Sequence, residues 1–338
     1  MPALHRVLIA CAVALLMVLT TLPGTAKAPE ADDATEVEVV AVHDHEANRH
    51  LFRISSKELA SGWTTFRFVN ASPVDHFFLI WQYPEEGIAA ANEAGQTLLD
   101  HWFENVAGSF AGFGDYLEGR IELEAYAAQI VASFQENAPW FLDPGAIPNG
   151  GPGFTSAGAT STTTVFLEPG DYIVECYVRD EYGVFHTELG MLDHLSVGEQ
   201  ESGTEQPSAT ARVVISSEGG IEVKIEPVAG SNIIEVHYAD QTVYPHFLGH
   251  NVQLIWLRDK DDDEALAAIA QWMDWRHPDG LVNRVPARAR FVGGVMEMSQ
   301  GASGYLHVNL EPGDYAWIAE VPDPANLGML KTFTISDD

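Results

Sequence analysis

Short runs of β-branched and aromatic residues recur along the chain, separated by Gly, Pro and Asn. The clearest runs in the first part of the chain cover residues 63–69, 77–81, 162–167 and 172–178. Runs of this length, bounded by turn-forming residues, are typical of β-strands. They predict an all-β sandwich.

A different pattern interrupts the strands between residues 82 and 149. Apolar residues there fall at helical spacing: Leu99, Trp102, Phe103, Val106, Phe110, Leu123, Ala127, Ile130 and Phe134. A shorter version later in the chain begins with the acidic cap 261–263 and continues with Leu266, Ile269 and Met273. The spacing predicts a helical insert between strands in both places, larger in the first, with its apolar stripe packed on the sandwich.

The hexapeptide Leu-Glu-Pro-Gly-Asp-Tyr occurs twice, and other short segments recur around it in the same order. The matching segments are Leu-Ile-Trp (79–81 and 254–256), Gly-Gly (150–151 and 293–294), the hexapeptide (167–172 and 310–315) and Gly-Met-Leu (190–192 and 328–330). Repeated segments in the same order predict a tandem duplication.

The duplication sets the expected domain boundaries. Residues 36–198 and 211–336 are predicted to form two separate sandwiches that superpose on each other. Residues 199–210, rich in Gly, Ser and acidic residues, are predicted to form an exposed acidic linker.

The N-terminus has the composition of an export signal. Arg6 precedes an apolar run, residues 7–19, which is followed by small residues. This predicts a signal peptide over residues 1–28, cleaved after Ala26 or Ala28, and a mature protein in the periplasm or outside the cell. The alternatives are a retained membrane anchor and lipidation at Cys11. No second apolar segment approaches membrane-spanning length, so no span is expected after signal removal.

The charge balance narrows the range of partners. The chain has 49 acidic and 17 basic residues, for a formal net charge of −32. Such a surface repels nucleic acid phosphates and anionic membranes, so neither is an expected partner. The composition fits a protein from a salt-loving organism or an ordinary acidic secreted protein.

The cysteines limit the covalent chemistry. Cys11 lies in the predicted signal, so the mature chain keeps only Cys176 and has no internal disulfide. A single cysteine in an oxidising compartment is a buried thiol, a partner in an intermolecular disulfide or a metal ligand.

The residues around Cys176 favour the third interpretation, that Cys176 is a metal ligand. His186 and Met191 follow Cys176 after the first hexapeptide, and His76 follows an Asn-containing turn that begins at Asn70. The set resembles the ligands of cupredoxins, in which a His early in the domain joins a Cys, a His and a Met on one C-terminal loop. The resemblance implies two tandem cupredoxin-like Greek-key β-sandwiches and one type-1-like copper ion in the first, held by His76, Cys176, His186 and Met191.

The residue types suit copper. A thiolate and two imidazoles hold the ion in a plane, and a thioether lies on the axis. The sequence departs from the familiar loop, because nine residues separate Cys176 from His186. Lengthening a loop costs little entropy, so a metal site is still expected, though a less rigid one.

The second copy is degenerate. Ala319 stands where Cys176 stands, its loop has no His, and only Met329 survives; His250 is offset by one residue from the position of His76. A one-residue offset turns a strand side chain to the opposite face. The second copy is therefore not expected to bind copper. Because every predicted ligand precedes residue 192, copper binding is expected not to need that copy.

These residues also have simpler interpretations. Cys176 can be an inert core thiol and Met191 ordinary packing, while His76 and His186 can be loop residues. His43, His45 and His50 can catch a metal weakly, but they fit a solvated hairpin better.

Three functions follow from these alternatives. The first is an exported copper-binding protein for single-electron transfer or copper carriage, with a redox or copper-exchange protein as partner. The second is a metal-free binding module. The third, a copper enzyme, is less favoured: Tyr177 follows Cys176 where such enzymes commonly use a His, and no hydrolytic triad is visible.

Overall fold

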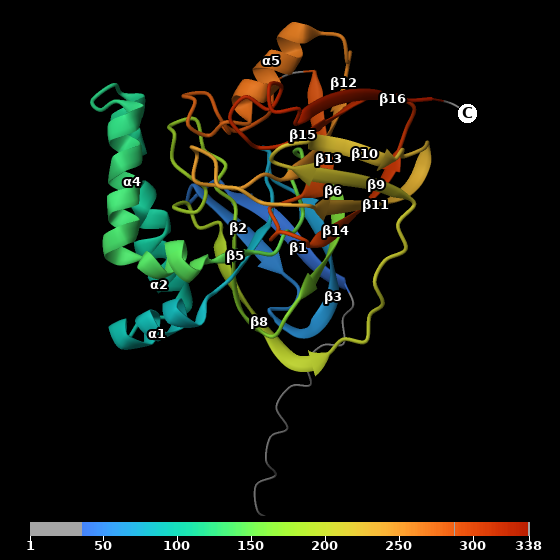
Figure 1. Cartoon of the computed structure of the whole chain (residues 1–338). Coiled ribbons are helices and arrows are strands. Elements are labelled where there is room, and N and C mark those ends of the chain that lie inside the picture. The colour runs from blue at the N-terminus through green and yellow to red at the C-terminus, as the bar shows by residue number, and fades with distance from the viewer. Residues whose placement is uncertain (1–35, 287, 337–338) are drawn as a thin grey trace, which may run out of the picture. The chain divides into compact units, whose positions relative to one another are not determined.

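The computed structural model describes residues 36–286 and 288–336 (Figure 1). The predicted signal peptide, with its cleavage site and Cys11, lies outside these residues. The described residues belong to one compact unit. Within them, no helix has both the length and the apolar character needed to cross a membrane.

The first half is built from two groups of four strands. They are β1 (Glu36–Asp44), β2 (Arg49–Ile54), β3 (Glu58–Asn70), β4 (Leu79–Gln82), β5 (Ile147–Pro148), β6 (Thr160–Leu167), β7 (Gly170–Glu175) and β8 (Leu192–Glu201). One group has the order β2-β1-β3-β6 and the other β5-β4-β7-β8. The long strand β3 belongs to both, because residues 58–61 pair with β8 and residues 62–69 pair with β6. Gly62, with φ 114°, lies at this change of partner, where a left-handed backbone favours glycine.

The second half repeats these pairings. Its strands are β9 (Ala211–Ser216), β10 (Gly220–Ile225), β11 (Gly230–Tyr238), β12 (Val252–Leu257), β13 (Ala289–Val295), β14 (Ser303–Leu310), β15 (Gly313–Ile318) and β16 (Leu330–Ile335). The groups β10-β9-β11-β14 and β13-β12-β15-β16 correspond strand by strand to those of the first half. The all-β sandwich prediction is therefore confirmed.

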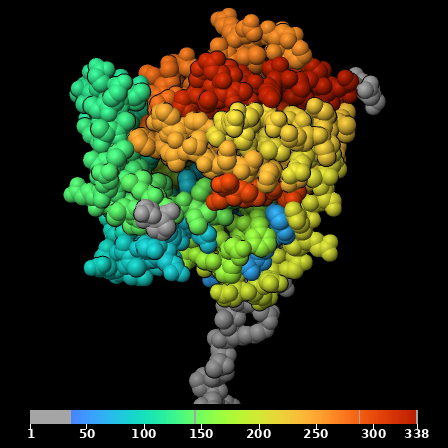
Figure 2. All heavy atoms as spheres, viewed as in Figure 1, coloured from blue at the N-terminus to red at the C-terminus, as the bar shows by residue number. Residues whose placement is uncertain are grey.

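The helical inserts are also confirmed. The first contains α1 (Glu85–Ala94), α2 (Leu98–Asn105), η1 (Ala107–Phe110), α3 (Phe113–Leu117), α4 (Leu123–Asn137) and η2 (Phe141–Gly145), and the second contains α5 (Asp263–Trp272). Asp262 caps α5 by accepting a hydrogen bond from the backbone N–H of Ala265. Figure 1 shows α1, α2 and α4 on one side of the strands, and in Figure 2 this segment meets the orange part of the second half.

The two halves share a sheet. Strand β6 pairs with β14 over three residues, so the larger sheet runs through both halves and has 12 strands. The two Gly-Gly pairs meet at the same junction: the N–H of Gly153 donates to Gly294, and the N–H of Met296 donates to Gly151. A Cβ on Gly151 would lie 2.1 Å from the carbonyl oxygen of Phe78, so glycine permits this close approach. The proposed boundary at residue 198 falls within β8, while residues 202–210 form neither helix nor strand.

The loop that follows β7 and the corresponding loop in the second half each have the same closing backbone hydrogen bond. The N–H of Cys176 donates to the carbonyl of Met191 at 3.1 Å, and the N–H of Ala319 donates to that of Met329 at 3.0 Å. The two loops thus close in the same way although only the first has a thiol.

Candidate metal centre

The loop after β3 carries His76 and is fixed by hydrogen bonds of its own. The side-chain amide of Asn70 donates to the carbonyls of Val74 and Thr155, and its oxygen accepts from the N–H of Ser72. Side chains of this type compete with regular structure and stabilise tight turns. The Asn-containing turn that the sequence singled out therefore sets the position of His76.

The hydroxyl of Ser72 orients the ring of His76. Ser72 Oγ lies 2.7 Å from His76 Nε2, and both side chains are buried. With Nε2 engaged in this bond, Nδ1 is the nitrogen that faces the candidate site. A hydrogen bond of this kind to the remote nitrogen is what holds a metal-binding imidazole in orientation.

His76 lies close to two other predicted ligands. His76 Nδ1 lies 3.2 Å from His186 Nδ1 and 3.5 Å from Cys176 Sγ. All three side chains are 0% exposed. The strand ending at Glu175 presents Cys176, and the loop that follows returns His186 beside it.

Met191 lies in the same part of the fold. Its side chain is fully buried, and its N–H donates to the carbonyl of His186 at 2.8 Å. Together with the bond from Cys176 to its carbonyl, this joins the backbone of Met191 to two other predicted ligands.

The nine residues between Cys176 and His186 form an ordered hairpin. The N–H of His186 donates to the carbonyl of Val178 at 2.8 Å, which closes the hairpin. At its turn, Asp180 Oδ1 accepts from the N–H groups of Tyr182 and Val184. The extra length is thus used in local hydrogen bonds of the hairpin.

The second half supports both ligand segments. Asp75, the residue before His76, accepts a hydrogen bond from the N–H of Val285 at 2.8 Å. In the hairpin, the buried Arg179 exchanges backbone hydrogen bonds with Leu281 and Asn283, and its guanidinium lies 4.5 Å from the centre of the Phe113 ring. Every predicted ligand precedes residue 192, but several residues that hold the ligand segments in place follow it.

The sequence predicted that His50 lies in a solvated hairpin, but the structure buries its side chain. It lies on β2, is 4% exposed, and its ring stacks on that of His186 with centroids 3.8 Å apart and planes 12° apart. Suitable nitrogens of His50, His76 and His186 lie within 4.8 Å of one another. An imidazole nitrogen donates in the plane of its ring, so the nearly parallel rings of His50 and His186 cannot both point at one ion, whereas those of His76 and His186, 51° apart, can.

The sequence around His50 indicates only weakly that its side chain faces inward. His50 directly precedes the apolar residues of β2, and the register pairs it with His43 across the hairpin. Only the packing of the hairpin against the ligand loop shows that His50 faces inward.

Burial keeps the site uncharged in the absence of a metal. Desolvation, reinforced by neighbouring imidazoles, lowers the pKa of His76 and of His186 well below the usual value for histidine. Desolvation also raises the pKa of Cys176 to about 12, and backbone hydrogen bonds from Phe77 and Val178 act in the opposite direction. Neutral imidazoles are ready to bind a metal, while the thiol must first lose its proton.

The donor spacing fits a metal ion. Nitrogens about 2.0 Å and sulfur about 2.3 Å from one ion lie about 3.3 Å (N to N) and about 3.5 Å (N to S) apart at tetrahedral angles, and about 3.5 Å and about 3.7 Å apart when the three donors are in one plane with the ion. The corresponding distances here are 3.2 Å between the two Nδ1 atoms and 3.5 Å from Nδ1 to Sγ. His186 Nε2 is buried without a hydrogen-bond partner.

The second half has none of this convergence. Ala319 and Met329 are buried, and the ring of His250 is engaged by the hydroxyl of Tyr244 at 3.3 Å and the carbonyl of Asp240 at 3.0 Å. None of these three residues supplies a thiolate.

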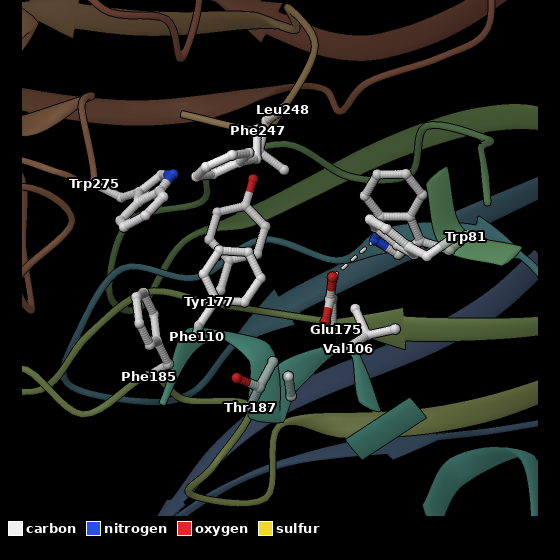
Figure 3. A pocket seen from close by; sticks show the side chains of 12 residues that line it. Trp81, Val106, Phe110, Glu175, Tyr177, Phe185, Thr187, Phe247, Leu248 and Trp275 are labelled. Atoms are coloured by element: carbon white, nitrogen blue, oxygen red, sulfur yellow. Dashed lines mark hydrogen bonds between the residues drawn. The ribbon is translucent and has the colours of Figure 1, made fainter. Parts of the chain in front are cut away.

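A small cavity of about 50 Å³ lies beside the candidate centre (Figure 3). Glu175 and Tyr177, the neighbours of Cys176 in sequence, both line it, together with aromatic residues from the helical insert and the second half. The indole N–H of Trp81 donates to Glu175 at 2.8 Å, and that of Trp102 lies 3.4 Å from its other oxygen. Burial raises the pKa of Glu175 to about 7.

Comparisons with known proteins find solved structures only. No protein-family model and no curated protein matches the chain. An auracyanin from Roseiflexus castenholzii is 13% identical over 39% of this chain and 99% of its own, with a TM-score of 0.27. Auracyanin A, a "blue" copper protein from Chloroflexus aurantiacus, is 17% identical over 48% of this chain and 99% of its own, with a TM-score of 0.23.

A blue copper oxidase from Nitrosomonas europaea covers more of the chain. It is 11% identical over 88% of this chain and 84% of its own, with a TM-score of 0.22. The matched proteins belong to the class that the ligand-loop resemblance names. At these identities and TM-scores the likeness carries no argument for this chain, so its function is argued from its own residues.

Proposed function

We propose that this chain is an exported, mononuclear copper protein that transfers single electrons to or from a protein partner in the periplasm or outside the cell. The proposed ligands are His76, Cys176, His186 and Met191, all in the first half. The observation that carries the proposal is the position of His76 Nδ1, which lies 3.2 Å from His186 Nδ1 and 3.5 Å from Cys176 Sγ in a fully buried site.

The donor set accounts for the choice of metal. A thiolate with two imidazoles and a thioether favours copper and suits both of its oxidation states, so bound copper supplies one-electron redox chemistry. Within the chain, Ser72 orients the His76 ring, and backbone hydrogen bonds from Phe77 and Val178 favour the thiolate form of Cys176. These groups hold the donors in one arrangement before and after electron transfer.

Electron transfer is favoured over copper carriage by the way the ligands are held. His76, Cys176 and His186 are fully buried, and the segments on which they lie are hydrogen-bonded to the second half. A carrier has to release its ion to a partner, which buried donors on tied segments hinder. The arrangement therefore suits a resident ion.

Copper loading of the metal-free protein tests the proposal. One equivalent of copper should give an intense visible thiolate-to-copper charge-transfer band, and Cys176→Ser should abolish it because a hydroxyl cannot replace the thiolate. His186→Ala should strongly weaken copper binding, whereas His194→Gln, which changes a histidine on β8, should leave the band intact. A folded protein that binds no copper at Cys176 would support the metal-free binding module instead.

A further inference from the structure

A row of imidazoles connects the solvent with the buried centre. His45 lies exposed in the β1–β2 hairpin, and its ring is 4.1 Å from that of His43. His43 stacks on His50 at 4.3 Å, and His50 stacks on His186 at 3.8 Å. The row therefore leads from an exposed side chain to a proposed copper ligand without a break.

Several nitrogens in this row have no hydrogen-bond partner. Both ring nitrogens of His43, Nδ1 of His50 and Nε2 of His186 are buried and unpaired. A buried polar atom without a partner costs free energy, so such atoms are uncommon in folded proteins. Clustered imidazole nitrogens that no protein group satisfies are candidates for binding a metal ion.

An open groove gives ions access to the row. It has a volume of about 470 Å³, and His43, His45 and His50 all line it. Asp180 and Glu181 line it as well, together with Arg284, and the chain has a net charge of −32. An acidic protein surface raises the local concentration of cations and speeds their association.

The ring planes distinguish the roles of the three hairpin imidazoles. The rings of His43 and His45 lie 4.1 Å apart with their planes tilted by 55°, and the exposed ring of His45 is free to rotate so that a nitrogen of each residue meets one ion. The ring of His50 is nearly parallel both to His43, at 5°, and to His186, at 12°. His50 therefore lies between the outer pair and His186, and its ring has to rotate before it can share an ion with either neighbour.

We propose that His43 and His45 capture copper ions from solution and that His50 passes them to His186. The inference rests on the proposed function, since it supplies the buried centre with its ion. In each step a bond from copper to one imidazole nitrogen breaks as a bond to the next forms, with no change in oxidation state. When the ion reaches Cys176, a copper–sulfur bond replaces the S–H bond and the proton leaves to solvent.

The rate of copper loading tests this route. Metal-free protein is mixed with Cu(II), and the growth of the thiolate-to-copper band is followed in the wild type and in the double variant His43→Gln, His45→Gln. The double variant should reach the same final band but load at least about tenfold more slowly, because the imidazoles that capture the ion first are gone while the acidic groove is unchanged. His194→Gln is the matched control and should load at the wild-type rate. An unchanged loading rate in the double variant would overturn the proposal.

A second measurement separates this inference from the proposed function. Cys176→Ser protein is titrated with Cu(II), and imidazole-bound copper is detected by pulsed electron paramagnetic resonance. The outer pair should give a signal that is lost when His43→Gln and His45→Gln are added, whatever happens at the inner site. If neither the wild type nor any variant forms the thiolate band, the proposed function fails. The resonance signal still tests the outer pair independently, because a signal that persists without His43 and His45 would rule that pair out.

Discussion

The carboxylate of Asp75 accepts a hydrogen bond from the backbone N–H of Val285 at 2.8 Å, which ties the residue before His76 to the second half of the chain. Its other oxygen accepts from the N–H of Ala157 at 3.2 Å. The proposed ligand His76 is thus positioned in part by the second half of the chain, which carries none of the proposed ligands. This gives the second half a physical role in the site.

Asp75→Ala is expected to affect both stability and copper binding. The substitution leaves one buried N–H group, that of Val285, and one partly buried N–H group, that of Ala157, without acceptors, which should lower the free energy of unfolding by about 1–3 kcal/mol. Copper affinity should fall as well, because the turn that presents His76 loses its anchor. Urea unfolding and copper titration measure the two effects, with Asp261→Ala, a change at an exposed side chain, as the control. Wild-type affinity in Asp75→Ala would show that the second half does not position His76.

Ser72→Ala should weaken copper binding while the protein stays folded. Removing the hydroxyl frees Nε2 of His76, so the ring loses the bond that aims Nδ1 at Cys176 and His186. Loss of such an orienting bond typically costs about 10- to 100-fold in metal affinity. Competition with a chelator of known affinity measures the change. Ser56→Ala, which removes an exposed hydroxyl bonded to the carbonyl of Glu58, should have no effect.

Met191→Leu should raise the reduction potential of the copper centre and leave copper binding largely intact. The thioether is a weak axial donor, and leucine keeps the volume of the side chain. The chain offers its own control in Met329→Leu, the corresponding change in the second half, where no thiol is present. Redox titration of the visible band compares the two variants. Equal potentials in both would remove Met191 from the proposed ligand set.

Stability should fall as the pH rises through neutrality. Burial raises the pKa of Glu175 and of Glu297 to about 7 from 4.5, so the folded state keeps protons that the unfolded chain releases between these values. Each group stabilises the folded state fully below about pH 4.5 and loses this effect above about pH 7, which amounts to roughly 3 kcal/mol.

Urea unfolding of the metal-free protein at pH 5 and pH 8 measures this dependence. Glu297→Gln should weaken it, because an amide does not titrate, while Glu175 keeps its own contribution. Glu199→Gln, at an exposed position on β8, should follow the wild type. A wild-type slope in Glu297→Gln would mean that this carboxyl is ionised throughout the range.

Much of the centre could be predicted from the chain because the ligands lie on short local motifs. The Asn-containing turn before His76 and the hexapeptide before Cys176 each fix one segment through contacts between near neighbours. The contribution of His50 could not be predicted in this way. Its inward position depends on the packing of the β1–β2 hairpin against the ligand loop, which adjoin only in the folded chain.

The sequence by itself determined the strand and helix pattern and the repeated pairings, because residue type and spacing encode these locally, and its resemblance to cupredoxins implied the four proposed ligands. Only the tertiary structure decided that the two halves share a sheet and that Asp75 and Arg179 are held by the second half. It also decided that a hairpin of histidines leads to the centre. These features join residues far apart in the chain, and they depend on which buried polar groups find partners once the strands have packed.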